Sequence, residues 1–406
     1  MKKGSAWYFA YFPHSVAFSI LSVLVPLYLV DSLGGSLFDL GVMTAAAALF
    51  VIPASILFGK LPGRFGRAKP FILASFLSTG LLTLLLSEAK TIPLFQALFV
   101  LMTVADSMRI TPTNLFIAEF HPRKSWGRAF ARYHFVLGAA SATGLAACSL
   151  FITSVGYKTM LWTCGPLVLA SSLIALLLVD DPPLYVERWL SRLERPIDEV
   201  TSLSYQLDAQ GHLLGGVRAM PRLGGRLSVV HAGLGFTMFS FAANCAFTSL
   251  PVYLTKKASM SSQTVFTIFL IRSIVGTVSY IIAGKWVSGR SGEAAVKSAT
   301  GLRVLLALLL PAIAVIPTPT SPLVAAIILS SFSFSFALFA IGRSMVVMEY
   351  ASEGSLGAYE ALDGLGSMVG GLLGGIIPAV YDFNILFLTC SALFASALLL
   401  FIKGLR

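Results

Sequence analysis

Three ionisable residues interrupt long apolar runs of the sequence, where such side chains are rare. Asp106 and Arg109 stand three residues apart in the run 92–116, and Arg272 stands near the middle of the run 262–284. A charge at membrane depth costs about 2.5–3.5 kcal/mol on insertion scales, so it needs a partner or a wet cavity. Groups of this kind bind anions, pair with one another or carry protons.

The spacing leaves two interpretations for each group. Asp106 and Arg109 share one helical face, so a local ion pair accounts for them as well as a functional role does. Arg272 has no charged neighbour in its own run; it either reaches a carboxylate on another run, with Asp106 as the first candidate, or faces water and binds an anion. Two arginines against one aspartate favour an anionic substrate. An Asp106 that alternates between Arg and a proton would give proton coupling.

Three further polar residues are expected near the same path. His14, in the run 7–30, is a candidate for proton transfer or hydrogen bonding, with a packed and satisfied histidine as the alternative. Asn244 in the run 228–254 and Arg343 in the run 322–348 are expected to face the cavity, although Arg343 is close enough to the end of its run to snorkel.

Motifs for catalysis and for nucleotide binding are absent from the sequence. It contains no Gly-x4-Gly-Lys-Ser/Thr loop, no His-Glu-x2-His and no Gly-x-Ser-x-Gly, and its four cysteines lie singly inside apolar runs. We therefore expect no enzyme, no cofactor, no metal site and no nucleic-acid partner. Concentrative transport would have to use an ion or substrate gradient.

The composition requires that these residues be positioned by membrane helices. Only 12% of the 406 residues are charged and 56% are hydrophobic, with a mean hydropathy of +0.84, whereas soluble domains carry about 25% charged residues. One span takes roughly 20 apolar residues. Twelve runs qualify: 7–30, 38–59, 70–87, 92–116, 127–152, 159–179, 228–254, 262–284, 298–317, 322–348, 357–380 and 384–402.

The positive charges predict the orientation of these spans. Most of the 29 Lys and Arg fall at the chain ends and in alternate loops on one side, and the opposite loops hold only Lys90, Lys158, Lys256 and Lys257. By the positive-inside rule, both termini and the polar segment 181–227 are cytoplasmic. We expect an integral protein of a prokaryotic plasma membrane, in contact with lipid.

The two groups of six spans repeat one another. Pro26-Leu27-Tyr28-Leu29 recurs as Pro251-Val252-Tyr253-Leu254, and Gly59-Lys60 recurs as Gly284-Lys285, both at an offset of 225 residues. The sequence thus predicts an all-α membrane protein of twelve helices in two pseudo-symmetric six-helix bundles. The bundles are residues 1–180 and 228–406, and the linker 181–227 carries an amphipathic helix at the interface.

The segment Gly59-Lys60-Leu61-Pro62-Gly63-Arg64-Phe65-Gly66-Arg67-Ala68-Lys69 resembles the loop between spans two and three of the major facilitator superfamily. The resemblance implies secondary transport by alternating access, with spans one, four, seven and ten around the substrate path. It also implies that spans two, five, eight and eleven form the seam between halves, where the glycines of span eleven (Gly366, Gly370 and Gly374, with Gly371 and Gly375 beside them) would pack. Ordinary packing within one half is the alternative.

One position of this loop departs from the family pattern. The matches are Gly59, Leu61, Arg64, Gly66, Arg67 and Lys69, but Gly63 occupies the place of an Asp that in the family latches the loop to span eleven. Glu360 and Asp363, near the start of span eleven, are expected to offer a carboxylate to Arg64 or Arg67 instead.

The leading prediction is a secondary transporter for a small organic solute, with anionic or amphipathic solutes preferred and proton coupling left open. One alternative is efflux of hydrophobic drugs, in which Phe332, Phe336 and Phe339 on one face of span ten would form the apolar half of a pocket; the other reading turns these rings toward lipid. A receptor or channel is the alternative from another class.

Overall fold

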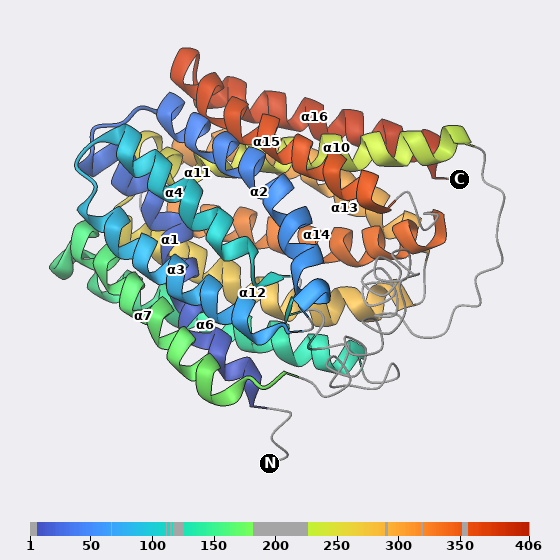
Figure 1. Ribbon diagram of the computed structural model, residues 1–406. Helices are drawn as coiled ribbons and strands as arrows, with labels where there is room; N and C mark the ends of the chain where they lie inside the picture. Colours follow the sequence, from blue (N-terminus) through green and yellow to red (C-terminus); the bar gives the residue numbers. More distant parts are fainter. Residues whose placement is uncertain are drawn as a thin grey trace, which may run out of the picture.

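The chain is all-helical wherever its structure is described. The computed structural model describes residues 6–65, 67–110, 112–113, 116, 126–181, 226–288, 291–317, 320–350 and 356–405, so residues 182–225 of the predicted linker, with its amphipathic helix, lie outside the described residues. Within this part there is no strand, and ten helices are long and apolar enough to cross a membrane. Helices satisfy all their own backbone groups, as lipid requires. The predicted all-α membrane architecture is confirmed (Figure 1).

The N-terminal half begins with a 3-10 turn, η2 (Trp7–Tyr11), that leads into α1. Its helices are α1 (Phe12–Leu27), α2 (Leu37–Phe65), α3 (Lys69–Glu88), α4 (Ile92–Ser107), α6 (Trp126–Val155) and α7 (Tyr157–Leu178). α2 continues six residues beyond the predicted end of span two, so much of the predicted loop between spans two and three is helical.

The C-terminal half has the same order of helices. They are α10 (Arg226–Thr248), the short α11 (Leu250–Val252), α12 (Ser262–Ser288), α13 (Gly292–Leu309), α14 (Ser321–Tyr350), α15 (Leu356–Val380) and α16 (Phe383–Gly404). A 3-10 turn, η6 (Leu310–Ala314), extends α13.

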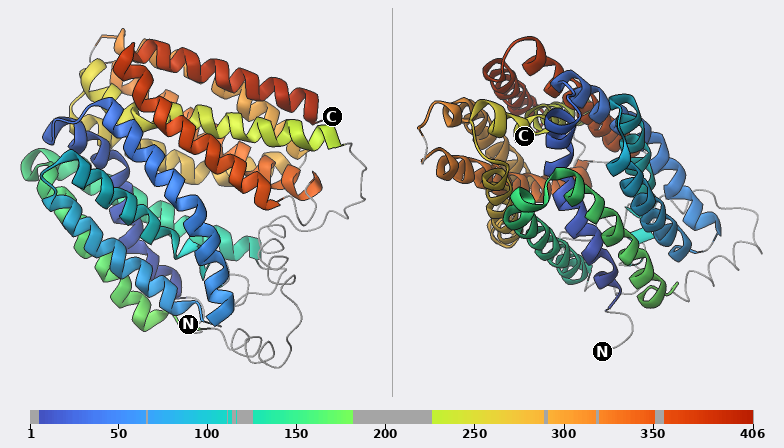
Figure 2. Two further views of the ribbon diagram at one scale, coloured as in Figure 1. Left: turned by 45° about the horizontal axis from the view of Figure 1, so that its top comes forward. Right: turned by 90° about the vertical axis from the view of Figure 1, so that its left-hand side faces the viewer.

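The helices pack into two bundles whose axes are inclined to one another (Figure 2). α3, α7, α13 and α16 lie on the outside, and their leucine-rich faces are exposed, for example Leu177 (78%) and Leu305 (60%). In a membrane these faces contact lipid, because no water-soluble chain would leave so many large apolar side chains uncovered.

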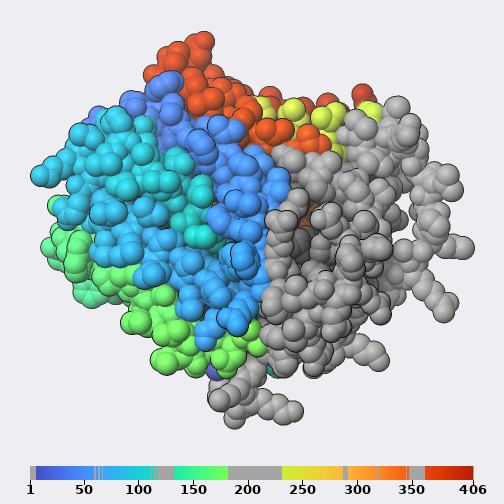
Figure 3. Space-filling model, in the orientation of Figure 1, coloured from blue at the N-terminus to red at the C-terminus, as the bar shows by residue number. Residues whose placement is uncertain are grey.

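The halves meet along two pairs of helices, α2 with α15 and α6 with α12. In the space-filling view α2 (blue) abuts α15 (orange-red) (Figure 3). The glycines of α15 divide between two faces: Gly370 and Gly374 lie against α10 in the same half, whereas Gly371 and Gly375 lie against α2 across the seam. The predicted seam contact therefore holds for Gly371 and Gly375, and the alternative of packing within one half holds for Gly370 and Gly374. In both places the small residues let helix backbones approach closely.

The internal repeat extends to the backbone geometry at the end of the first span of each half. α1 is followed by the π-helical turn η3 (Tyr28–Ser32), and α11 is followed by the π-helical turn η5 (Tyr253–Lys257), again 225 residues apart. Gly34 and Ser259, at the same offset, both have positive φ, +69° and +52°. The two halves therefore share the details of their turns as well as the order of their helices.

Span four is the one that differs most from its prediction. The helix α4 ends at Ser107, and a turn at Met108 and Arg109 interrupts the predicted run 92–116. Pro112 explains the break, because it has no N–H for the carbonyl four residues earlier and its ring collides with that carbonyl. The hydroxyl of Ser75 on α3 donates instead to the carbonyl of Ala105 (2.9 Å), so the broken end keeps hydrogen bonds.

Candidate substrate cavity between the two halves

A cavity of about 430 Å³ lies between the halves at mid-length of the helices. Its N-terminal side comes from α1, α6 and the turn after α4, and its C-terminal side comes from α12 and α14. Of the predicted site residues, His14, Arg109 and Arg272 line it. The structure therefore brings together groups that are more than 90 residues apart, and it places an arginine from each half at one cavity.

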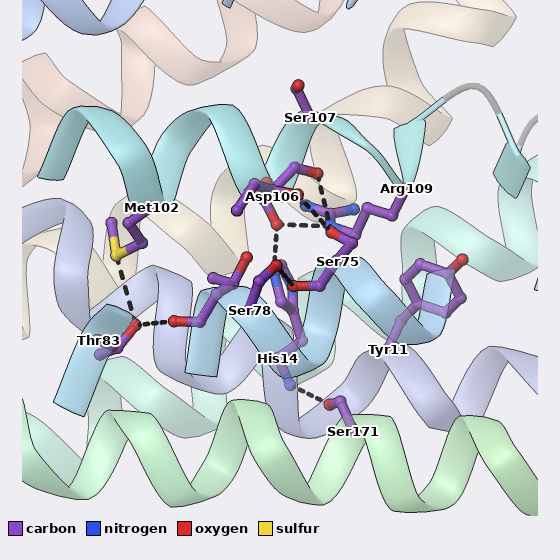
Figure 4. Close-up of polar contacts among 12 residues, drawn as sticks. Tyr11, His14, Ser75, Ser78, Thr83, Met102, Asp106, Ser107, Arg109 and Ser171 are labelled. Carbon is purple, nitrogen blue, oxygen red and sulfur yellow. Dashed lines mark hydrogen bonds and ion pairs between the residues drawn. The ribbon is translucent and has the colours of Figure 1, made fainter. Parts of the chain in front are cut away.

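Asp106 is the centre of a buried polar cluster on the N-terminal side (Figure 4). Its Oδ1 lies 2.7 Å from His14 Nε2 and accepts from Arg109 Nε at 2.7 Å, while its Oδ2 accepts from Arg109 Nη2 at 2.9 Å. The two-bond geometry between Arg109 and Asp106 matches the fork of a guanidinium to a carboxylate. The ion pair expected from their spacing is present, and His14 joins it.

The surroundings hold this cluster in one geometry. His14 is 2% exposed, its backbone N–H donates to Ser171 on α7 (2.8 Å), and its ring stacks on Phe18 at 4.2 Å. Arg109 lies 6.0 Å over the ring of Tyr11. Because the charges of Asp106 and Arg109 cancel, this side of the cavity is close to neutral when His14 is uncharged.

Arg272 stands on the other side of the cavity without a carboxylate. Its Nε donates to Ser333 Oγ at 3.3 Å, and its guanidinium lies 4.7 Å from the ring of Phe247 and 5.3 Å from that of Phe269. No acidic side chain of the described residues pairs with it, and Asp106 is committed to Arg109 and His14. The predicted pairing of Arg272 with Asp106 is therefore not found, and Arg272 lines the cavity instead.

A fourth buried charge, Arg303 on α13, was not singled out from the sequence. It is 2% exposed, lies 4.6 Å over Phe239, and donates to Ser335 Oγ at 3.2 Å. The rings of Phe332, Phe336 and Phe394 lie between 5.5 and 5.6 Å from its guanidinium. Its position inside the apolar run 298–317 was the sequence signal that could have identified it as a buried charge. Arg303 does not line the cavity, and Phe332 and Phe336 surround it rather than a pocket.

Asn244 and Arg343 lie outside the cavity, contrary to expectation. The Asn244 amide donates to Ser240 O at 2.9 Å and to Ser367 Oγ at 3.0 Å, which ties α10 to α15. Arg343 Nη1 donates to Asp363 Oδ2 at 3.3 Å. Both residues were expected to face the cavity because their helices were expected to surround it. Each side chain instead lies on the face of its helix that packs against α15.

The structure bears on only part of the predicted switch loop. Gly66 lies outside the described residues, and the structure describes only the helical backbone of Gly59 and Arg64 in α2 and of Glu360 in α15. Arg67 is exposed. The Asp363 carboxylate is engaged by Arg343 and by the Ser240 hydroxyl, not by Arg67. The described contact of this loop is at its C-terminal end, where α3 begins. There Asp181 Oδ1 accepts from the backbone N–H groups of Ala68 and Lys69, both at 2.8 Å.

Polar contacts join the halves at the end of the molecule where η3 and η5 lie. Lys256 Nζ is 2.6 Å from Asp31 Oδ1, and these residues occupy equivalent positions of the repeat. The hydroxyl of Tyr157 on α7 is hydrogen-bonded to Ser262 on α12. Lys158–Glu88 (2.9 Å) and Lys257–Asp382 (3.3 Å) are ion pairs at the same end, but each stays within one half.

Comparison with known proteins identifies the architecture. The family model of the Major Facilitator Superfamily matches residues 7–359. No curated protein matches the sequence. A solved structure of a mutant of the nucleoside transporter NupG is similar with a TM-score of 0.76 and 12% identity over 100% of both chains.

Two further solved structures share the fold. The human organic anion transporter MFSD10 (TETRAN) has a TM-score of 0.65 and 16% identity over 99% of this chain and 100% of its own. The xylose transporter XylE from E. coli, in a partially occluded inward open conformation, has a TM-score of 0.65 and 14% identity over 100% of this chain and 96% of its own.

Proposed function

The chain belongs to the Major Facilitator Superfamily, and on that premise we propose that it is a secondary transporter whose substrate is a small organic anion. The observation that carries this proposal is Arg272. It lines a cavity between the two halves, and no carboxylate of the described residues neutralises it. A buried charge of this kind is costly unless a partner or water offsets it, and a bound anion would offset it.

The broken helix at Arg109 supports the same site. Discontinuous helices in transporters expose backbone and side-chain polar groups at the midplane, where substrates bind. Here the break after α4 sets Arg109 at the cavity opposite α12, so that the substrate would touch both halves. A ligand that contacts both halves can change the relative stability of the two orientations of the halves, and alternating access requires this coupling.

We further propose that residues 1–180 and 228–406 are the two bodies that rock about this site, with the termini on the cytoplasmic side of a prokaryotic plasma membrane. The distribution of Lys and Arg supports the orientation. Seams of small residues, such as Gly371 and Gly375 against α2, allow helices to slide with little interlocking of side chains. The structural relatives named above carry a nucleoside, an organic anion and xylose, all small organic solutes.

Proton coupling is a separate proposal that rests on His14, Asp106 and Arg109. A conformational change of the two halves that separates Arg109 from Asp106 would leave that carboxylate beside His14, where it could take up a proton. Uptake of the substrate into proteoliposomes should then rise with an inward proton gradient, and His14→Gln should reduce this rise. Uptake that ignores the gradient in the unmutated protein would refute coupling and leave anion transport standing.

The test of anion recognition is a ligand-stabilisation screen of the purified protein. Organic anions, organic cations, neutral sugars and hydrophobic drugs are compared by the shift that each produces in thermal unfolding. We expect anions to stabilise the unmutated protein and Arg343→Gln, which removes an arginine outside the cavity, but not Arg272→Gln. Arg272→Lys keeps the charge and should retain part of the effect. Stabilisation by cations or drugs, with none by anions, would refute the proposal.

A further inference from the structure

The lining of the cavity, beyond its charge, narrows the class of anion. We infer that the substrate is a hydroxyl-bearing organic anion with a single negative charge, of the polyhydroxy monocarboxylate type. This inference rests on the proposed function, because it assumes that the cavity binds the substrate. It goes further by excluding apolar anions, such as fatty acids, and anions of higher charge.

The charge balance of the lining argues for one negative charge. Arg109 is already neutralised by the two bonds that it donates to Asp106. Arg272 is the single cation of the cavity lining without an acidic partner among the described residues. One uncompensated positive charge is offset by one carboxylate. A second carboxylate on the ligand would have to displace Asp106 from Arg109 or remain buried without a counter-ion.

Serine hydroxyls argue for a hydroxylated ligand. Six serines line the cavity, and they come from both halves: Ser15, Ser19, Ser22, Ser141, Ser273 and Ser333. Ser19 and Ser22 donate to carbonyls of their own helix, and Ser333 accepts from Arg272. Within the described part of the chain, the hydroxyls of Ser15, Ser141 and Ser273 have no hydrogen-bond partner. They are free to bond a ligand.

The aromatic rings of the lining are already occupied by polar side chains. Phe18 stacks on His14 at 4.2 Å, and Phe269 lies 5.3 Å from the guanidinium of Arg272. Phe332 and Phe336 surround Arg303 and do not line the cavity. An apolar ligand would therefore find little free aromatic surface, and it would strip water from serine hydroxyls without replacing their bonds. A buried polar group left unpaired weakens binding by about tenfold or more.

The size of the cavity fits a small solute. Its volume of about 430 Å³ is near the lower end of the range typical for small-molecule sites, roughly 300–1,000 Å³. A five- or six-carbon acid with its hydroxyl groups fits this space, together with some water. A lipid with two acyl chains exceeds it.

The test compares matched pairs of probes by direct binding to the purified full-length protein. Aldonates of five and six carbons in several configurations, including gluconate and ribonate, are set against pentanoate and hexanoate, which lack the hydroxyls. Glucose serves as the uncharged polyol, and glucarate carries a second carboxylate. We expect at least one aldonate to bind ten times more tightly than its deoxygenated partner, than glucose and than glucarate.

Variants separate the contributions of charge and hydroxyls. Arg272→Gln should weaken aldonate binding at least tenfold. The double variant Ser141→Ala/Ser273→Ala should weaken aldonate binding about tenfold and leave hexanoate unchanged or tighter. The matched control is Ser154→Ala/Ser331→Ala, in which both serines donate to their own helix outside the cavity. It should behave as the unmutated protein.

The outcomes distinguish this inference from the proposed function. Arg272-dependent binding of hexanoate that equals that of every aldonate would overturn the inference and leave anion transport intact. An unchanged preference in the Ser141/Ser273 double variant would also overturn it. If no probe anion binds in an Arg272-dependent way, both the inference and the proposed function fail.

Discussion

The Asp31–Lys256 ion pair is predicted to stabilise the state in which the halves are closed at the η3/η5 end. The pair is 2.6 Å long, with the Asp31 side chain 20% exposed and the Lys256 side chain 55% exposed. Pairs this open to solvent contribute about 0.2–1 kcal/mol. Lys256→Asp removes that attraction and adds a repulsion of similar size, for a total of about 2 kcal/mol at most. The ratio of closed to open molecules should fall by up to about 30-fold.

A charge swap gives this prediction its sharpest form. Asp31→Lys/Lys256→Asp restores an ion pair between equivalent positions of the repeat, so the closed fraction should return to within about threefold of the unmutated protein. Lys257→Asp is the matched control. It makes the same change at the neighbouring residue, but Lys257 pairs with Asp382 of its own half. It should leave the closed fraction unchanged.

The assay is a distance distribution between spin labels at Lys90 and Val315, which are exposed near this end of different halves. Lys256→Asp should add or enlarge a long-distance component, and high salt should reduce the difference from the unmutated protein. If Lys256→Asp and Lys257→Asp give the same distributions, or if the swap fails to restore the short distance, the pair does not hold the halves together. The Tyr157–Ser262 hydrogen bond would then be the next contact at this end to test.

Thermal unfolding of three variants, two of them paired with a comparison variant, tests the packing described above. Gly375→Ala places a Cβ about 2.5 Å from the Cα of Gly41 across the seam and should lower the free energy of unfolding by about 1–3 kcal/mol. The control Gly301→Ala, whose nearest neighbouring atom lies 3.8 Å from the new Cβ, should lower it little. Equal effects would contradict the tight seam. Arg303→Met should unfold at the same temperature or higher, because the arginine has an unbonded Nη1 and no acidic partner in the described part of the chain; a loss as large as that of Arg303→Ala would show that the charge itself is required. Asp106→Asn leaves Arg109 without its counter-ion and should cost about 3–5 kcal/mol, and an unchanged unfolding temperature would mean that the pair is dispensable.

The architecture was predictable because lipid leaves the chain few choices. Apolar runs of about 20 residues must be helices, and a repeated spacing such as Pro26 to Pro251 must place similar turns in similar positions. The sequence also indicated that Asp106 and Arg109 could pair, since three residues on a helix bring side chains to one face. These features depend on local periodicity, and local periodicity is visible in a sequence.

The parts that were missed depend on how each helix is rotated against its neighbours. Asn244 and Arg343 lie on helices expected at the substrate path, yet both face α15. Pro112 was a readable signal for the break after Ser107. It has no N–H to donate to the carbonyl of Met108, so the predicted helix should have ended near that residue. Arg303 carried the same insertion cost as Arg272, but the aromatic rings that surround it come from three other helices, and no spacing in the sequence brings these together.

The central claim is that an organic anion crosses the membrane by way of Arg272. The most direct measurement is the uptake of a radiolabelled anion, chosen from the binding screen, by proteoliposomes that contain the unmutated protein, Arg272→Gln or Arg343→Gln. The account predicts saturable uptake by the unmutated protein and Arg343→Gln, and uptake at the level of empty liposomes for Arg272→Gln when equal amounts of folded protein are inserted. Uptake by Arg272→Gln at the rate of the unmutated protein would contradict it.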